Sequence, residues 1–527
     1  MNRKKLAEAS SVALLTAISA WFFTLSNTFR DSISGDFPEY IRIAKNLSLN
    51  PETFNPVGTW PLGYPLLLRM ASFNGSWQHA GSLISFIFSA TIGISAFYLL
   101  RTCFDNISSL FGAIASMMTR PVLVNSVGYS SDVPAMAFAF VSLANFALWS
   151  KKKSQGYLFM AGVFAGLSYL IRYSSITVGL LLLAMILLYP LFDKQPFKIA
   201  TIVVHSFIFL GGWILAASPQ LIGSWITHGN PLYTENGCNV ALAMGLNMKI
   251  GGLTWTNVKD VFPYCRSLTA VIAHDPREFV YNFRANLFTS AQLMNLQIVA
   301  SLFCMISLCF FSKKCDERWH RNFVVATISA VAISNILVVS LAFVTERHLI
   351  LSISLLNCIS CAVIVSSIKE KSQKSWIALF FLIPIVLESL FTAQLSPLFR
   401  RLSPRTEKTL QTYEILKSLG CKYFFKDDII TKFDTVLIGD DFILPDKYIK
   451  IGNQPWRRNY KSFLTIESTK AWMLKNGYKC LIFDEDSLLK RIPSIDGDSF
   501  RQEYKQGKLF AKKAKASSHQ TLVFSMK

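Results

Sequence analysis

Long apolar runs separated by short polar loops dominate the chain up to about residue 394. A run of about 20 apolar residues is long enough to cross a hydrocarbon layer as a helix. The pattern predicts about eleven spans and so an α-helical polytopic membrane protein. The predicted spans are 10–28, 79–100, 107–120, 132–149, 156–171, 173–192, 198–223, 291–311, 322–343, 347–368 and 375–394.

Lysine and arginine residues concentrate in alternate loops, which predicts the orientation of the spans. Cytoplasmic loops of membrane proteins carry an excess of these residues. The basic positions are Arg3 to Lys5, Lys151 to Lys153, Lys194, Lys198, Lys313, Lys314, Arg318, Arg321, Lys369, Lys371 and Lys374. They share one side if the N-terminus is cytoplasmic. An odd number of spans then places the C-terminus outside, together with the loops at 29–78 and 224–290.

From about Ser396 the composition becomes that of a soluble domain. The pattern predicts helices at 406–419 and 468–476 and strands at TVLIG (435–439) and KCLIF (479–483). Alternating helices and strands are typical of an α/β module. We therefore divide the chain into a transmembrane domain, 1–394, and a small extracytoplasmic α/β domain, 395–527.

Composition supports the membrane interpretation. Hydrophobic residues make up 52% of the chain and charged residues only 16%, and the mean hydropathy is +0.37. A soluble domain carries about a quarter charged residues. The net charge of +21 could indicate a nucleic-acid partner, but most of the basic residues lie in short loops between apolar runs or in the tail. We therefore predict no nucleic-acid binding, and no cleavable signal peptide is evident.

The ten cysteines do not form a framework. Cys358 and Cys361 lie within an apolar run without the strand and helix context of a redox motif, which predicts small buried residues. Disulfides could form in an oxidising outer compartment, although the sequence alone does not decide whether they do. The possible pairs are Cys238 with Cys265, and Cys421 with Cys480.

The candidate chemistry begins directly after the first span. Asp36 and Glu39 are three residues apart, so in a helix both carboxylates lie on one face. Apolar residues at Tyr40, Ile43, Ala44 and Leu47 predict an amphipathic helix. Trp60 and Tyr64 belong to an aromatic, proline-rich turn that follows.

Ionisable side chains at membrane depth are costly and therefore informative. Asp132, Arg172, Glu346, Arg347 and His348 all fall at the predicted outer ends of spans. Any one of them could simply be a snorkelling or capping residue. Together they predict a charged site on the outer face.

Six motifs in order resemble the GT-C superfamily of membrane glycosyltransferases. They are GDFPEYIRIAKNL, WPLGYPLLL, SSDVP, AGLSYLIRYSS, GNPLYTEN and ERHLIL. More closely, residues 10–370 are similar to the branch of protein O-mannosyltransferases, the lipid A aminoarabinose transferase and rhizobial lipopolysaccharide sugar transferases. Two positions depart from the branch: Phe37 stands where many relatives have the second acid of an Asp-Glu pair, and Leu62 where many have proline.

The resemblance implies a hexosyl- or pentosyltransferase that uses a polyprenyl-phosphate sugar and a lipid, glycan or protein acceptor on the extracytoplasmic face. Asp36 is then the general base, and a single displacement inverts the anomeric centre. A lipid phosphate leaves as an anion, so Arg172 or Arg347 could stabilise it. Expected substrate-binding residues are Glu39, Tyr40, Trp60, Tyr64, Asp132, Arg172, Tyr173, Arg347 and His348. Asp132 could bind sugar hydroxyls or orient a basic group.

Several alternatives stay open at this point. A transporter or flippase of lipid-linked sugars would also place charges at membrane depth, but transporters usually show repeat symmetry. A polymerase or ligase of lipid-linked glycans and a receptor-like scaffold are further candidates. No cofactor or metal is assigned, although Asp484 and Asp486 form an Asp-x-Asp that could bind a metal. The motifs favour a bacterial cytoplasmic membrane over the endoplasmic reticulum.

Overall fold

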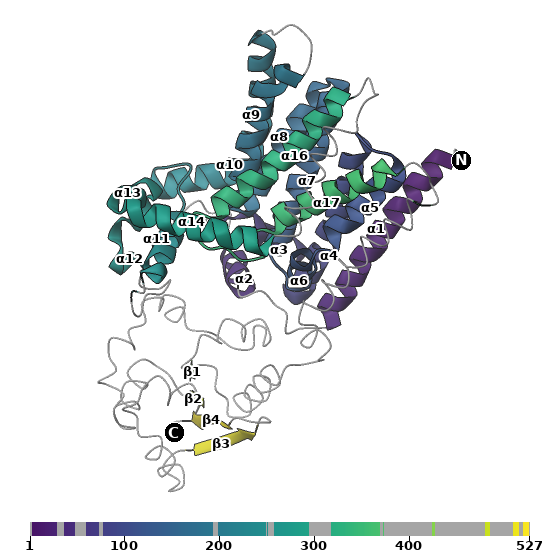
Figure 1. Cartoon of the computed structure of the whole chain (residues 1–527). Coiled ribbons are helices and arrows are strands. Elements are labelled where there is room, and N and C mark those ends of the chain that lie inside the picture. The colour runs from purple at the N-terminus through teal and green to yellow at the C-terminus, as the bar shows by residue number, and fades with distance from the viewer. Residues whose placement is uncertain are drawn as a thin grey trace. The chain divides into compact units, whose positions relative to one another are not determined.

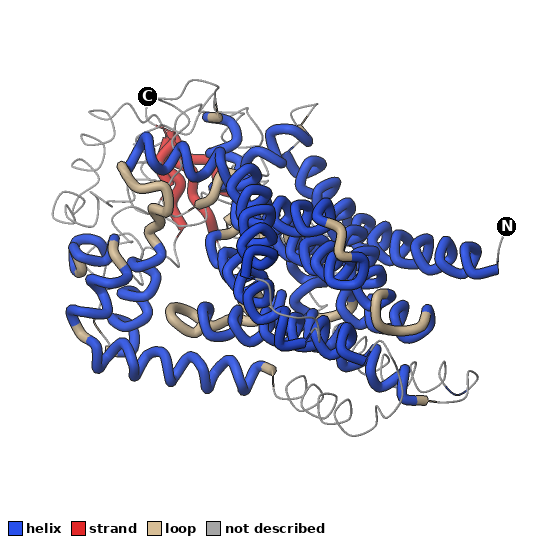
Figure 2. The backbone as a smooth tube through the Cα atoms, turned by 90° about the horizontal axis from the view of Figure 1, so that it is seen from above, coloured by secondary structure: helices blue, strands red, loops and turns tan. Residues whose placement is uncertain are grey.

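Helices are the regular elements of residues 1–395 wherever the structure describes them, as the blue tubes of Figure 2 show. This computed structural model describes residues 3–28, 36–47, 60–72, 77–192, 199–248, 250, 258–294, 318–368 and 373, together with four strands near the C-terminus. The chain divides into two compact units. One contains residues 1–28 and 40–395, and the other contains 29–39 and 396–527.

The helices of the first unit are labelled in Figure 1. In chain order they are α1 (Arg3–Thr28), α2 (Phe37–Asn46), α3 (Gly63–Ala71), α4 (Trp77–Arg101), α5 (Asn106–Met117), α6 (Arg120–Val127), α7 (Asp132–Lys152), α8 (Gln155–Ile171), η2 (Tyr173–Ser175), α9 (Ile176–Phe192), α10 (Ile199–His228), α11 (Asn236–Asn247), α12 (Val258–Val261), η3 (Pro263–Arg266), α13 (Leu268–His274), α14 (Pro276–Leu293), α16 (Arg318–Val339) and α17 (Ile350–Ser367).

Within the described residues, seven helices are long and apolar enough to cross a membrane, or eight if one bent pair counts as a single span. The predicted number of about eleven is therefore not reached. The predicted span 375–394 and most of 291–311 lie outside the described residues. The predicted span 156–171 is α8, an apolar helix of 17 residues. The multipass membrane character predicted from the sequence is confirmed.

The span predicted at 107–120 is instead a broken pair. Helices α5 and α6 meet at a bend of 58°. Thr119 is extended, and Pro121 stands in the first turn of α6. Proline lacks the amide hydrogen and clashes with the preceding turn, so it begins a new helix more readily than it continues an old one. Hydropathy alone does not detect such a bend.

Glycine residues allow the closest helix crossing in the bundle. Helix α8 packs against α7 on one side and α10 on the other. A Cβ on Gly162 would lie 2.1 Å from the carbonyl oxygen of Phe209, and a Cβ on Gly212 would lie 2.4 Å from that of Phe159. Small residues at such crossings let two backbones touch, which is a common device in membrane bundles.

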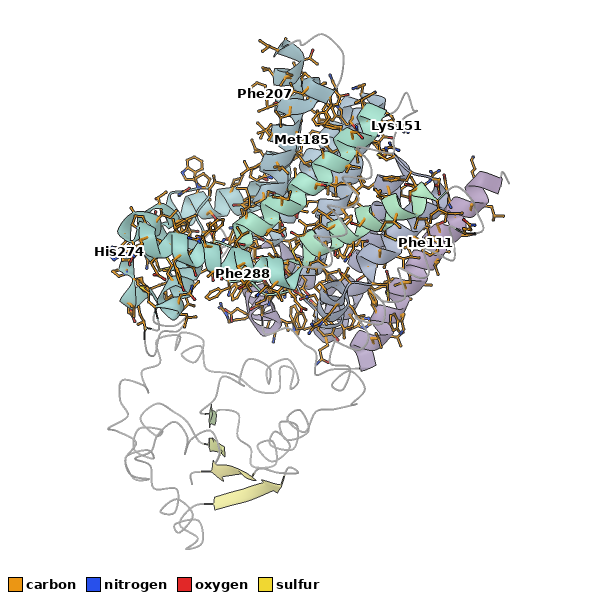
Figure 3. All side chains as sticks on the ribbon, in the orientation of Figure 1. Phe111, Lys151, Met185, Phe207, His274 and Phe288 are labelled. Atoms are coloured by element: carbon orange, nitrogen blue, oxygen red, sulfur yellow. A yellow bond between two sulfur atoms is a disulfide. The ribbon has the colours of Figure 1, made fainter. Side chains whose placement is uncertain are left out.

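Helix α14 holds the loop between α16 and α17 through buried amides. Asn282 Nδ2 donates to the carbonyl oxygen of Leu341 (3.2 Å), and Asn286 Nδ2 donates to that of Ala342 (2.5 Å). The opposite face of α14 is exposed and includes Phe288, labelled in Figure 3. The loop that carries Arg347 and His348 is therefore held at its start by α14.

The second unit contains a mixed sheet. Its strands are β1 (Phe424–Lys426), β2 (Cys480–Asp484), β3 (Phe510–Lys515) and β4 (Gln520–Ser525), in the order β1-β2-β4-β3. β1 and β2 are parallel and the other two pairs are antiparallel. The strand predicted at KCLIF is present as β2. The predicted helices 406–419 and 468–476, the strand at TVLIG, Cys421 and Asp486 lie outside the described residues.

The structure tests two of the predictions made for the cysteines. Cys238 and Cys265 form a disulfide, with a Cα–Cα distance of 4.4 Å. Cys358 and Cys361 lie within α17 and are buried, as predicted.

We expect the double variant Cys238→Ser/Cys265→Ser to lose stability in the α11–α13 segment. The disulfide spans 27 residues of sequence, and closing a loop of this length is worth roughly 3–4 kcal/mol. A lower thermal midpoint, compared with a Cys103→Ala control, would show this loss. An unchanged midpoint would mean that the disulfide does not stabilise the segment.

Candidate functional site

The centre of the candidate site is Asp132, the first residue of α7. Its side chain is 2% exposed and contacts two guanidinium groups. Arg347 Nε donates to Oδ2 at 2.8 Å, and Arg172 Nη1 contacts Oδ1. Ser130 Oγ donates to Oδ2 as well. Two guanidinium groups against one carboxylate leave a net positive charge, so the cluster can bind an anion.

Tyrosine hydroxyls from distant motifs hold the turn before Asp132. Tyr129 has a positive φ of 56°, a conformation that needs support from its surroundings. Tyr64 Oη donates to the Tyr129 carbonyl oxygen at 2.7 Å, and Tyr40 Oη lies 2.9 Å from Ser131 Oγ. Tyr40 and the WPLGYP and SSDVP motifs therefore meet at one point, which their spacing in the sequence does not reveal.

Three aromatic side chains form a small cluster beside this turn. The ring of Tyr40 packs edge-to-face against Trp60 (5.7 Å between centroids) and Tyr64 (4.9 Å). Tyr64 is fully buried. Tyr40 and Tyr64 therefore support Asp132, and the expected stacking of Trp60 and Tyr64 on sugar stays a prediction.

A buried glutamine that the sequence reasoning missed joins two further motifs. Gln220 Oε1 accepts from the Leu62 amide at 3.0 Å, and Gln220 Nε2 donates to Tyr173 Oη at 2.9 Å. Gly63 also allows the start of α3 to pack closely against the end of α8, since a Cβ there would lie 2.6 Å from the carbonyl oxygen of Leu170. A glutamine after proline within an apolar span was the available signal.

A cavity of about 540 Å³ opens beside the cluster, within the range typical of small-molecule sites. Its acidic and basic lining comes from Asp132, Arg172, Arg266 and His348. Polar lining comes from the GNPLYTEN segment, and apolar lining from α7, α16 and the start of α17. The cavity lining thus combines basic, polar and apolar side chains.

His348 lies in the loop before α17 and lines the cavity. Burial, together with the nearby Arg172 and Arg347 and against Asp132, lowers the pKa of His348 to about 4. The imidazole is therefore neutral at neutral pH, and its Nδ1 lies 3.2 Å from Thr345 Oγ1. His348 can form hydrogen bonds in the cavity but adds no charge to it.

An ion pair anchors the same loop from the other side. Glu346 Oε1 accepts from Arg120 Nη1 at 2.7 Å. Arg120 is the first residue of α6 and was not singled out from the sequence. Glu346, the acid beside Arg347, therefore helps to hold this loop in place.

Asp36 directly precedes α2 and Glu39 lies in its first turn; both belong to the second compact unit, whereas Tyr40 belongs to the first. The Glu39 amide donates to the Asp36 carbonyl oxygen at 3.1 Å, so α2 begins directly after Asp36. The helix predicted here is confirmed. The roles of Asp36 and Glu39 stay predictions.

No group of three or more His, Cys, Asp or Glu side chains with metal-binding geometry occurs among the residues that the structure describes. Asp484 ends β2, and the rest of the Asp-x-Asp lies outside the described residues. Metal dependence stays open.

Known proteins share this multipass helical fold. Residues 56–222 match the family described as dolichyl-phosphate-mannose-protein mannosyltransferase. This match covers the WPLGYP, SSDVP and SYLIRYSS motifs. A search of curated proteins found no match.

Solved structures agree with this family match. ArnT from Cupriavidus metallidurans bound to undecaprenyl phosphate is 12% identical, with a TM-score of 0.50, and the match covers 98% of this chain and 97% of that one. The Archaeoglobus fulgidus oligosaccharyltransferase AglB, in complex with an inhibitory peptide and a dolichol-phosphate, is 12% identical with a TM-score of 0.51. That match covers 92% of this chain and 70% of AglB. The chain is related to GT-C glycosyltransferases, as its motifs predicted.

Proposed function

We propose that this protein transfers a sugar from a polyprenyl-phosphate donor to a lipid, glycan or protein acceptor on the extracytoplasmic face, with inversion. The observation that carries the proposal is the Asp132–Arg172–Arg347 cluster beside a cavity that basic, polar and apolar side chains line together. Such a cavity suits a ligand with an anionic head and a hydrocarbon chain. ArnT and AglB were solved with ligands of this chemistry.

The reaction needs few groups from the protein. The acceptor oxygen attacks the anomeric carbon, and the bond from that carbon to the phosphate oxygen breaks with its electron pair moving to the phosphate. The guanidinium groups of Arg172 and Arg347 stabilise the phosphate anion as it forms. Asp36 takes the proton from the acceptor hydroxyl. Asp132 orients both arginines, and the neutral imidazole of His348 hydrogen bonds to the sugar or phosphate.

The proposed location is a bacterial cytoplasmic membrane rather than the endoplasmic reticulum, with the N-terminus in the cytoplasm. The Cys238–Cys265 disulfide supports an outer position for the segment after α10, because disulfides persist in oxidising compartments. Lys151 and Lys152, in the last turn of α7, mark the cytoplasmic end; Figure 3 labels Lys151. Asp132 begins the same helix and so lies at the outer end.

The test is incubation of the purified protein with radiolabelled polyprenyl-phosphate sugars and membrane extract. A labelled acceptor supports transfer. A transporter or flippase, the second candidate, would move the labelled donor across a vesicle membrane without labelling an acceptor. That second result would replace the enzyme proposal.

We expect Arg347→Ala to weaken binding of polyprenyl phosphate by roughly ten- to a hundredfold, the usual cost of a lost charged hydrogen bond. Arg347→Lys keeps the charge and should lose less. Arg284→Ala, an exposed change on α14, serves as the control. Equilibrium binding to the protein in nanodiscs measures the effect, and an unchanged affinity for Arg347→Ala would assign Arg347 a structural role.

A further inference from the structure

A further arginine, Arg266, lines the cavity from an element that carries no member of the Asp132 cluster. Arg266 is the last residue of η3 and forms part of the cavity wall. In the described part of the chain its guanidinium has no ion-pair or hydrogen-bond partner. The acid of the preceding segment, Glu235, accepts instead from Lys259 Nζ at 2.7 Å. Arg266 is exposed to this cavity, and a guanidinium without an ion-pair partner can bind an anionic ligand.

The position of Arg266 is fixed by the residue before it. Cys265 forms the disulfide with Cys238 in α11, and both cysteines are fully buried. Gly237 allows the two segments to touch, since a Cβ there would lie 2.4 Å from the Cys265 carbonyl oxygen. A covalent bond and a close backbone approach thus hold Arg266 against the start of α11. Such preorganisation lowers the cost of binding a ligand.

The wall around Arg266 carries neutral hydrogen-bonding groups. Asn230, Thr234, Asn236 and Asn239 line the same cavity, and Asn239 Nδ2 donates to Asn236 Oδ1 at 3.0 Å. Amides and hydroxyls can hydrogen bond to sugar hydroxyls in either direction. The guanidinium of Arg266 among them adds preference for a planar or tetrahedral anion.

We propose that Arg266 forms a second anion subsite, separate from the donor phosphate site, which binds a carboxylate or phosphate carried by the transferred sugar or by the acceptor. The proposal rests on the proposed function, because it assigns the rest of the same cavity to the substrate. Arg172 and Arg347 then hold the leaving phosphate. Arg266 selects substrates with an additional negative group.

The experiment is equilibrium binding to the full-length protein in nanodiscs. The first pair of probes is a farnesyl phosphate that carries a neutral hexose and one that carries a hexuronic acid. The second pair is a glycolipid with a phosphate group and its dephosphorylated form. The variants are Arg266→Gln and Arg266→Lys, with Arg284→Gln as the exposed control. Thermal midpoints establish that each variant is folded.

We expect the wild type and the Arg284→Gln control to prefer the anionic member of one pair by roughly ten- to a hundredfold, and Arg266→Gln to lose this preference. Loss with the sugar probes assigns the anion to the donor sugar, and loss with the glycolipids assigns it to the acceptor. Arg266→Lys should retain part of the preference. The subsite is refuted if wild type prefers neither anion, or if Arg266→Gln keeps the preference.

Binding is measured without turnover, so the two proposals fail separately. Absence of labelled acceptor in the transfer assay would remove the glycosyltransferase proposal and leave the anion preference of Arg266 as a measured fact. Conversely, transfer with no effect of Arg266→Gln on either pair of probes would leave the enzyme and remove the subsite.

Discussion

Asp36→Asn is expected to reduce sugar transfer by about two to four orders of magnitude, the usual contribution of a general base. The amide has nearly the same shape as the carboxylate but does not accept the proton of the acceptor hydroxyl. Donor binding should stay close to that of wild type, because the arginines hold the phosphate. Single-turnover transfer of radiolabelled sugar, at matched membrane levels of the protein, measures the loss.

The matched control is Asp105→Asn. Asp105 caps α5 by accepting from the Ser108 amide at 3.0 Å, and asparagine caps helices equally well. This variant makes the same chemical change away from the cavity and should keep full transfer. Full transfer by Asp36→Asn would end the assignment of Asp36 as the base.

The second large effect is expected from Asp132→Asn. This change leaves Arg172 and Arg347 close together without the carboxylate that separates them. Losing one member of a buried ion pair costs about 3–5 kcal/mol, and we expect the low end because both arginines are partly exposed. The thermal midpoint of the purified protein and its donor affinity should both fall.

A double variant distinguishes charge from packing. Asp132→Asn/Arg347→Gln removes one of the two uncompensated charges, so it should be more stable than the sum of the single changes predicts. Strictly additive losses in this cycle would show that Asp132 does not act by holding the arginines.

Much of the helical framework could be predicted from hydropathy, because a span needs a long apolar run and little else. The charged residues at the outer ends of spans were predicted as a group for the same reason. Their pairing was not predictable. Asp132 and Arg347 are 215 residues apart, and nothing in the local sequence says which acid meets which base.

The errors have local physical causes. Pro121 breaks a run that hydropathy counts as one span. Gln220 and Tyr129 were missed because each acts by a hydrogen bond to a residue that is distant in the sequence. Gln220 accepts from the Leu62 amide, and Tyr129 accepts from the Tyr64 hydroxyl. The hydrogen bond from the Tyr64 hydroxyl to the Tyr129 carbonyl oxygen was not predicted either, and the expected stacking of Tyr64 on sugar stays a prediction. Such contacts depend on tertiary structure, which periodicity does not encode.

The residues of the Asp132 cluster are synthesised, and enter the membrane, at different times. Asp132 and Arg172 flank α7 and α8 and enter the bilayer early, as a pair whose opposite charges cancel. Arg347 arrives only with the approach to α17. The Asp132–Arg172 pair is therefore electrically balanced during insertion, and this cluster gains its excess positive charge only when Arg347 docks against Asp132. A truncated chain that ends before Arg347 should integrate into the membrane yet be unable to retain a lipid phosphate.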